Sequence, residues 1–299
     1  MRVFVTGASG FVGSGITREL IKGGHQVVGL ARSDKAAATV EANGGAALRG
    51  ELGDLDVLKD AAREADAVVH AGFIHDFSNY AASIGTDQAA IEAMGDALAG
   101  KALIVTAGMG VKRSGSLATE DEAADLSHMP RMSEPTGLAQ ATKGVRAMVM
   151  RLPPSVHGPH DHGFIAALIA IARDKGTAGY VGEGSTRWSS VHRDDAARAY
   201  VLALEKGVAG ARYHAVADEG VPFRQIAETI GRKLGVPVRS VTPEQASEVL
   251  GWQARFAQFD APASSALTRQ RLGWAPTGSS LLDDMESGTY FDPMRTAAE

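Results

Sequence analysis

The 299-residue chain contains no cysteine. Disulfide bonds, thiolate metal sites and a cysteine nucleophile are therefore excluded. Aromatic residues make up only 6% of the chain, and its apolar runs are short. The longest run, residues 164–172, is much shorter than the roughly 20 residues that a membrane-spanning helix needs. We therefore predict a buried helix there and no membrane partner.

An excess of positive charge is also missing. The balance of 30 Lys and Arg against 35 Asp and Glu gives a net charge of −5, which argues against a nucleic-acid partner. The hydrophobic fraction of 44% and charged fraction of 22% are typical of a globular protein. We expect a cytoplasmic location, because no targeting segment precedes the first predicted strand. The length allows one large α/β domain with a smaller lobe.

The chain begins with a strand–glycine–helix–strand pattern. Two short apolar runs, residues 3–5 and 27–30, are typical of strands buried on both faces. The glycines between them allow the backbone to approach a pyrophosphate, and the helix N-terminus offers free N–H groups to an anion. A purely structural turn is the alternative interpretation. The residues predicted to hold the pyrophosphate are Gly7, Ser9, Gly10, Phe11, Val12 and Gly13.

The end of the second strand indicates which dinucleotide binds. A site that prefers NAD usually has Asp or Glu there, to accept a hydrogen bond from the ribose 2′-OH. This chain has Arg32 and Ser33 instead, followed by Lys35, and these groups suit a 2′-phosphate. We predict NADPH, with NADH as the alternative cofactor. The other interpretation is that Arg32 and Lys35 are solvated loop charges.

Further apolar runs alternate with helical patterns, which predicts a Rossmann-type doubly wound parallel sheet in an α/β fold. We assign residues 1–160 to this dinucleotide-binding core, with one later strand added, and most of 161–299 to a smaller substrate lobe. Asp54 either contacts the adenine end of the cofactor or caps the helix that follows it. The predicted later strands are 46–50, 67–73, 102–106, 147–152 and 212–216, and the predicted helices include 57–65, 89–98, 164–173, 196–206, 223–234 and 243–250.

The lobe contains a glycine- and serine-rich stretch, residues 180–190, which we predict to be a loop lining the substrate pocket. Within it, Arg187 and Trp188 are candidates for substrate contact. A place for Trp188 in the hydrophobic core is the equal alternative.

Six short motifs occur along the chain. They are Thr6-Gly-x-x-Gly-x-x-Gly13, Gly53-Asp54, Val69-His70-Ala71-Gly72, Arg151-Leu-Pro153-Pro-Ser-Val-His157-Gly-Pro159, Val191-His192-Arg-Asp194-Asp195-Ala196-Ala197 and Leu272-Gly-Trp-Ala-Pro276. Together they resemble the extended short-chain dehydrogenase/reductase superfamily, whose familiar members are sugar-nucleotide epimerases and dehydratases. The resemblance covers nearly the whole chain and implies a nicotinamide cofactor. It implies contacts to that cofactor from Asp54, Leu55, Ala71, Gly72, Phe73, Thr106, Pro153, Ser155 and Val156.

One part of the superfamily pattern is missing. Its members carry a Tyr with a Lys four residues later, which lowers the pKa of the phenol so that it can pass a proton. No tyrosine of this chain has a Lys at that spacing, and none lies between residues 81 and 179. The helix expected there, from Ser133 onward, is predicted to be short and interrupted by Pro135 and Gly137. Thr106 is the nearest candidate for the upstream hydroxyl.

Histidines near the ends of the fourth and sixth strands are the candidate replacements. His75 and His157 are predicted to lie near the nicotinamide, and histidine readily exchanges protons near pH 7. The alternative is that they are surface or hydrogen-bonding groups. The sequence His160-Asp161-His162 is weak evidence for a metal, and we expect none.

The sequence therefore predicts an NADPH-dependent oxidoreductase that reduces a small carbonyl or imine by hydride transfer. A non-catalytic NADP(H)-binding sensor or scaffold is the alternative, and a sugar-nucleotide epimerase or dehydratase is less favoured because both Tyr and Lys are absent. The expected partner is a small-molecule substrate, and the chain is expected to be a monomer or homodimer.

Overall fold

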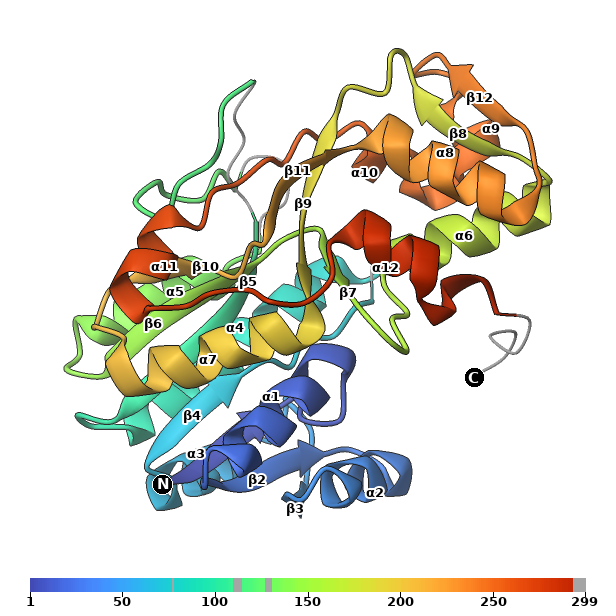
Figure 1. The fold of residues 1–299 in the computed structure, drawn as a ribbon. Coiled ribbons are helices and arrows are strands. Elements are labelled where there is room, and N and C mark those ends of the chain that lie inside the picture. Colours follow the sequence, from blue (N-terminus) through green and yellow to red (C-terminus); the bar gives the residue numbers. More distant parts are fainter. Residues whose placement is uncertain (77, 110–114, 127–130, 293–299) are drawn as a thin grey trace.

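The centre of the molecule is a seven-stranded sheet with the order β10-β6-β5-β4-β1-β2-β3, in which all neighbours are parallel (Figure 1). The structure is a computed structural model that describes all residues except 77, 110–114, 127–130 and 293–299. The predicted doubly wound Rossmann-type sheet is confirmed. The strands are β1 (Arg2–Thr6), β2 (Gln26–Ala31), β3 (Ala46–Arg49), β4 (Ala67–His70), β5 (Ala102–Gly108), β6 (Arg146–Leu152) and β10 (Arg212–His214).

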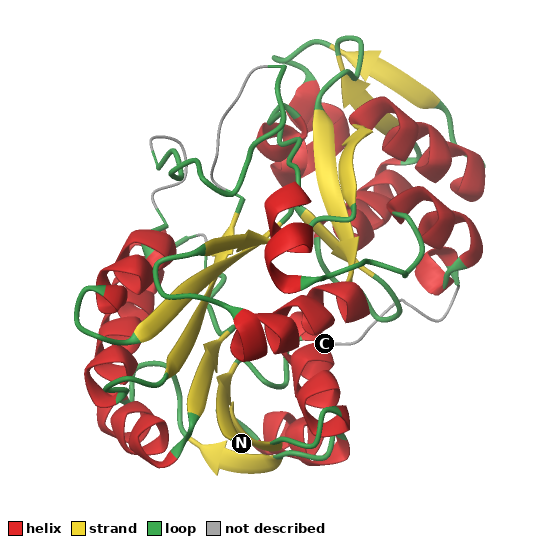
Figure 2. Ribbon diagram, turned by 60° about the vertical axis from the view of Figure 1, so that its left-hand side comes forward, coloured by secondary structure: helices red, strands yellow, loops and turns green. Residues whose placement is uncertain are grey.

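Helices cover both faces of this sheet, as Figure 2 shows. On one face, apolar side chains such as Ile16 and Tyr200 pack against the inner residues of the strands. On the other face, side chains such as Leu58 and Ile91 do the same. The first face is covered by α1 (Phe11–Lys22), α2 (Asp34–Ala42) and α7 (Arg193–Lys206), and the second by α3 (Leu55–Glu64), α4 (Tyr80–Ala97) and α5 (Ser133–Ala141).

The helix α5 differs from the prediction. It runs unbroken through Pro135 and Gly137, because Pro135 lies in the first turn, where a proline costs no intrahelical hydrogen bond. Gly137 lets the helix approach β5 closely, since an added Cβ would lie 2.9 Å from Val105. Glu134 ties the helix to the sheet through Arg151, with both bonds at 2.6 Å.

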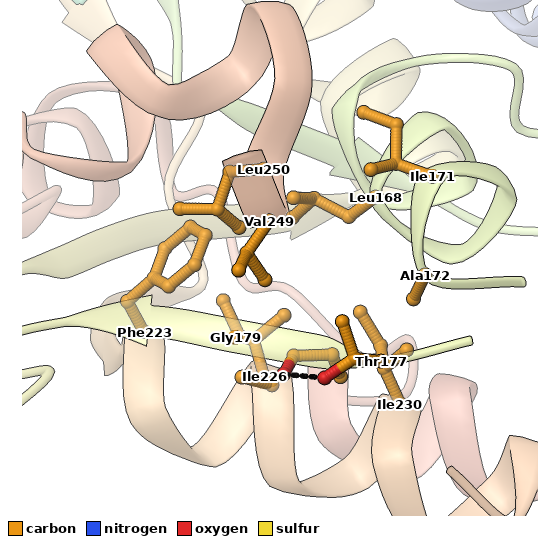
Figure 3. Close-up of a pocket in the computed structure, with 12 residues that line it drawn as sticks. Leu168, Ile171, Ala172, Thr177, Gly179, Phe223, Ile226, Ile230, Val249 and Leu250 are labelled. Carbon is orange, nitrogen blue, oxygen red and sulfur yellow. Dashed lines mark hydrogen bonds between the residues drawn. The ribbon is translucent and has the colours of Figure 1, made fainter. Parts of the chain in front are cut away.

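A second group of elements lies beyond the carboxyl end of the sheet, at the upper right of Figure 1. Two parallel strands, β8 (Ala178–Val181) and β12 (Val238–Val241), pack against apolar helices. Figure 3 shows side chains of α6, α8 and α9 converging there around a hollow of about 10 Å³, which is too small for a substrate. The helices of this group are α6 (Phe164–Lys175), α8 (Phe223–Leu234), α9 (Ala246–Leu250), η1 (Gly251–Gln253), α10 (Ala254–Ala257), α12 (Leu281–Ser287) and η2 (Thr289–Phe291).

A three-stranded sheet, β11-β9-β7, contains part of the stretch predicted as a loop. Its strands are β7 (Ser155–His157), β9 (Arg187–His192) and β11 (Asp218–Pro222). The prediction of a loop over 180–190 was therefore wrong, since strands occupy both of its ends and the turn is confined to residues 182–186. Trp188 is 1% exposed in the apolar core, and Arg187 pairs with Asp260 at 2.9 Å.

Several elements from the second half of the chain pack on the seven-stranded sheet or extend it. After β9, the helix α7 packs against α1, and α11 (Ala266–Leu272) brings Leu272 and Trp274 into the same core. The Trp274 indole donates to the carbonyl oxygen of Asp195 at 2.9 Å. Residues beyond 160 thus contribute to both groups of elements. In the described part of the chain, no helix has the length and apolar character required to cross a membrane.

Candidate active site

The turn between β1 and α1 can be built only from glycine at two positions. Gly7 has a φ of +68°, and a Cβ added there would lie 2.7 Å from the carbonyl oxygen of Ala71. A Cβ on Gly13 would lie 1.9 Å from the carbonyl oxygen of Gly7. The turn is closed by the Gly10 amide, which donates to the same oxygen at 2.9 Å. The backbone is therefore bare at this site, as close contact with a ligand requires.

The first turn of α1 suits an anion. Gly10 caps this helix without any side-chain hydrogen bond, and no acidic residue lies in its first turn. The leading amides, which begin at Phe11, have no partner within the helix and carry its positive dipole end. Val12 and Ser9 flank this point and are half-buried. The cradle and the free amides fit the diphosphate of a dinucleotide.

A hollow lined by two arginines and two acidic residues, Glu51 and Asp54, lies at the ends of β2 and β3. It has a volume of about 410 Å³, and Arg32 lines it together with Arg49. Among the described residues, Arg32 has no hydrogen-bond or ion-pair partner, while Arg49 pairs with Asp34. Arg49 was missed in the sequence. The signal for it was its place at the end of the strand beside Ala31.

The other predicted residues near this hollow have defined local roles. The Ser33 hydroxyl caps α2 by accepting from the Ala36 amide at 3.2 Å, and Lys35 is exposed in the first turn of that helix. Asp54 makes no side-chain cap to α3, which Leu55 begins. The Asp54 carboxylate instead accepts from the Glu51 amide at 2.8 Å and lines the hollow.

The residues after β4 gather around an arginine that the sequence did not identify. The guanidinium carbon of Arg131 lies 3.9 Å from the centre of the Phe73 ring. Phe73 also makes edge contacts with His75 and Tyr80, at 5.2 Å and 6.0 Å between ring centres. Burial raises the pKa of Tyr80 above 10.0 despite the opposing charge of Arg131, so this phenol holds its proton.

His75 is exposed to solvent on the rim of this cluster. Burial of its ring among neighbouring atoms and the charge of Arg131 lower the pKa of His75 below its ordinary 6.5, and His162 adds to this effect. The lowered pKa means that His75 gives up a proton more readily than a free imidazole. His162 itself contacts the Phe11 ring at 5.8 Å. The cluster therefore borders the glycine turn.

A buried chain of hydrogen bonds connects the floor of the turn to Arg131. The Gly72 amide donates to the Thr6 hydroxyl at 3.1 Å, and that hydroxyl lies 2.8 Å from Nδ1 of His70. Nε2 of His70 is 3.0 Å from Asp87 and donates to it, because a carboxylate only accepts. Ser133 donates to the same carboxylate at 2.5 Å and accepts from Nε of Arg131 at 2.8 Å.

Asp87 is the anion of this chain. Burial alone would raise its pKa, but the hydrogen bond and charge of His70, the charge of Arg131 and the bond from Ser133 together lower the pKa of Asp87 below 3.8. The carboxylate is therefore ionised. Among the described residues, Ser133 alone connects it to Arg131 by hydrogen bonds. This arrangement fixes the direction of the guanidinium group.

Thr106, the expected upstream hydroxyl, is already engaged. It is 7% exposed, and its Oγ1 lies 2.8 Å from the hydroxyl of Tyr200 in α7. Burial raises the pKa of Tyr200, so this phenol is a poor proton donor. The Thr106 carbonyl oxygen accepts from Arg131 at 3.4 Å.

The residues after β6 are mostly enclosed. Pro153 is buried and Val156 is half-buried. Ser155 is 2% exposed, and its hydroxyl has no hydrogen-bond partner among the described residues. His157 is 0% exposed, with Nδ1 2.9 Å from Asp284. In this position, the His157 ring is shielded from any ligand.

The His160-Asp161-His162 sequence is arranged for packing. The Asp161 carboxylate accepts from the Tyr290 hydroxyl at 2.6 Å and from the Gly163 amide, also at 2.6 Å. His162 turns toward Phe11, as described above. Asp161 therefore serves to join this loop to η2 near the carboxyl end of the chain.

Comparisons with known proteins identify the family of the chain. The model of the NAD dependent epimerase/dehydratase family matches residues 3–111 and 132–216. An uncharacterized protein of Schizosaccharomyces pombe is 48% identical over 97% of this chain and 100% of its own. A 2-alkyl-3-oxoalkanoate reductase of Stenotrophomonas maltophilia is 29% identical over 79% of this chain and 77% of its own.

Solved structures show the same fold. A dTDP-glucose 4,6-dehydratase from Streptomyces venezuelae, crystallised with NAD, superposes with a TM-score of 0.77. The alignment covers 97% of this chain and 96% of that one, at 21% identity. At this identity the likeness concerns the fold alone.

Proposed function

The chain belongs to the NAD-dependent epimerase/dehydratase family, and from this premise we propose that it is an NADPH-dependent oxidoreductase that reduces a small carbonyl or imine. Two observations carry the proposal, the glycine cradle at Gly7 and Gly13 and the hollow lined by Arg32 and Arg49. One part suits a diphosphate and the other suits an additional phosphate. The name of the Stenotrophomonas relative, a reductase, supports the reaction type.

The cofactor's phosphates would be held at opposite ends of one binding track. The amides that follow Gly10 would bind the diphosphate, while Arg32, Ser33 and Lys35 would bind the 2′-phosphate together with Arg49. Asp54 and Leu55 lie beside the hollow, where the adenosine part would pass. When bound, the reduced nicotinamide supplies the hydride.

The substrate side of the site is formed by residues after β4 and β5. We propose that His75 delivers the proton that completes reduction, since it is exposed and its pKa is lowered. Thr106 would have a positioning role, because its hydroxyl bonds to Tyr200 and its carbonyl oxygen accepts from Arg131. His157 would act as a structural group, because its buried ring is bonded to Asp284.

A non-catalytic NADP(H) sensor is the second candidate, and one observation favours it. The Tyr and Lys pair of the superfamily pattern is missing, since no tyrosine of the chain has a Lys four residues later. On α5, an added Cβ at Gly137 would lie 2.9 Å from Val105. An epimerase or dehydratase is less favoured for the same reason.

Calorimetric titration with NADPH and NADH, followed by nicotinamide absorbance with a panel of ketones, aldehydes and imines, tests the proposal. We expect tighter binding of NADPH and consumption of NADPH with at least one compound. Tight binding without turnover on the whole panel would favour the sensor. Absence of nucleotide binding would refute both candidates.

A further inference from the structure

Arg131 is an enclosed cation to which no carboxylate of the described residues is bonded. One edge of its guanidinium group donates from Nε to Ser133, and Nη2 donates to the Thr106 carbonyl oxygen at 3.4 Å. Among the described residues, nothing accepts a hydrogen bond from Nη1, and no carboxylate forms an ion pair with this side chain. One face of the group is covered by the Phe73 ring at 3.9 Å. The Nη1 group of Arg131 therefore has N–H donors that no described residue uses.

The surroundings make this charge costly unless an anion joins it. Burial lowers the pKa of Arg131, while Asp87, Tyr80 and Tyr200 raise it in part. Arginine nevertheless stays protonated in proteins. A desolvated charge with unused donors is stabilised when a negative oxygen binds to it. The cluster is thus prepared for an anionic or strongly polarised oxygen atom.

Arg131 lies near the carboxyl ends of two central strands, β4 and β5. It lies between the residue that follows β4, Phe73, and the carboxyl end of β5, Thr106. In open parallel sheets ligands bind at the carboxyl ends of the strands. The same region lacks the Tyr and Lys that would otherwise polarise an acceptor.

On the basis of the proposed function, we propose that Arg131 binds the carbonyl oxygen of the substrate and stabilises the negative charge that forms on it, so that the substrate is a ketone or aldehyde and not an imine. The carbonyl carbon receives a hydride from the reduced nicotinamide, which is thereby oxidised. The C=O π electron pair moves to the oxygen, where Arg131 donates to it. A proton from His75 then completes the alcohol.

The charge of Arg131 disfavours the imine for a physical reason. A reducible imine reacts as its protonated, positively charged form, and hydride transfer removes that charge. A fixed guanidinium beside such a cation repels it, whereas the same group attracts the developing alkoxide. The chain of hydrogen bonds through Ser133 and Asp87 keeps Arg131 from turning away.

The test compares wild type with Arg131→Met and Arg131→Lys, and with Arg63→Met as a control. Arg63 lies exposed on α3, and its side chain pairs with the nearby Asp60. Calorimetry measures binding of benzoate and of benzylammonium to each protein loaded with NADP⁺. We expect benzoate to bind wild type and Arg63→Met, to bind Arg131→Met at least about tenfold more weakly, and benzylammonium not to bind. Thermal melting and NADPH affinity identify a variant that has lost its fold, and Arg131→Lys then provides the comparison.

Turnover gives the second measurement. With a reducible ketone, Arg131→Met should lower kcat by about 100- to 1,000-fold at unchanged NADPH affinity, and added guanidinium ion should restore part of the rate in Arg131→Ala. Equal benzoate affinity in wild type and Arg131→Met, absence of benzoate binding to wild type, or turnover of imines but not ketones would overturn the inference. Failure of NADPH to bind would instead refute the proposed function.

Discussion

The guanidinium carbon of Arg131 lies 3.9 Å from the centre of the Phe73 ring, although the two residues belong to different connections of the sheet. Phe73 follows β4, and Arg131 directly precedes α5. A cation over an aromatic face is attracted by the ring's negative face. This contact places a charge at the sheet's carboxyl edge, where the superfamily pattern would have supplied a Tyr and Lys.

The proposed preference for NADPH rests on the hollow lined by Arg32 and Arg49. We expect Arg32→Ala to weaken NADPH binding by about 10- to 150-fold, because each lost charge-assisted bond contributes about 1.5–3 kcal/mol. NADH affinity should hardly change, since NADH lacks the 2′-phosphate. Arg49→Ala should also weaken NADPH binding, and calorimetry measures the cofactor affinities of both variants. Equal losses for the two cofactors, or equal affinities in the wild type, would contradict the assignment.

The glycine turn should fail when a methyl group is added at its tightest point. Gly13→Ala places a Cβ 1.9 Å from the Gly7 carbonyl oxygen, so the turn must open and nucleotide binding should be lost. The matched control is Gly85→Ala in α4, where nothing lies within 4 Å of the added atom. That change should raise stability by up to about 1 kcal/mol. Calorimetry and thermal melting are the measurements, and unchanged nucleotide affinity in Gly13→Ala would argue against a binding role for the turn.

Reduction should depend on the protonation of His75. Because the pKa of His75 lies below 6.5, its proton is present at low pH, and the rate should fall as pH rises through that lowered pKa. Removing a neighbouring positive charge favours the protonated form. In Arg131→Met the midpoint should therefore move to higher pH. A pH–rate profile of wild type, Arg131→Met and His75→Ala tests this, and a profile unchanged in His75→Ala would exclude the residue as proton donor.

His157 should matter for stability more than for chemistry. Asp284→Asn removes the charged partner of the buried ring and should cost about 1.5–3 kcal/mol in the free energy of unfolding. Asp174→Asn, an exposed change on α6, should cost less than about 0.5 kcal/mol. Denaturant unfolding and NADPH affinity are measured together. A large loss of turnover in Asp284→Asn at unchanged stability would instead support a chemical role for His157.

Much of the fold follows from local pattern. The short apolar runs at 3–5 and 27–30, with glycines between them, predict β1, α1 and β2, because parallel strands are buried on both faces. Boundaries were less predictable. The stretch 180–190 reads as a loop because it is rich in glycine and serine, yet strands occupy both ends, since pairing with β12 and β11 outweighs local preference. Trp188 was an open question until its burial in the core was seen.

The sequence by itself determined the proposed phosphate-binding side of this protein. Glycines at 7, 10 and 13 and a cation at 32 act through nearby backbone and one local turn, so their spacing along the chain carries the information. Only the tertiary structure brought together the residues that are proposed to contact the substrate. Arg131 contacts Phe73, and Asp87 through Ser133, only after β4, α4 and β5 have packed. No spacing in the sequence encodes contacts that depend on the distances between separate elements. Burial, which engages Thr106 and encloses His157, is likewise a property of the assembled layers.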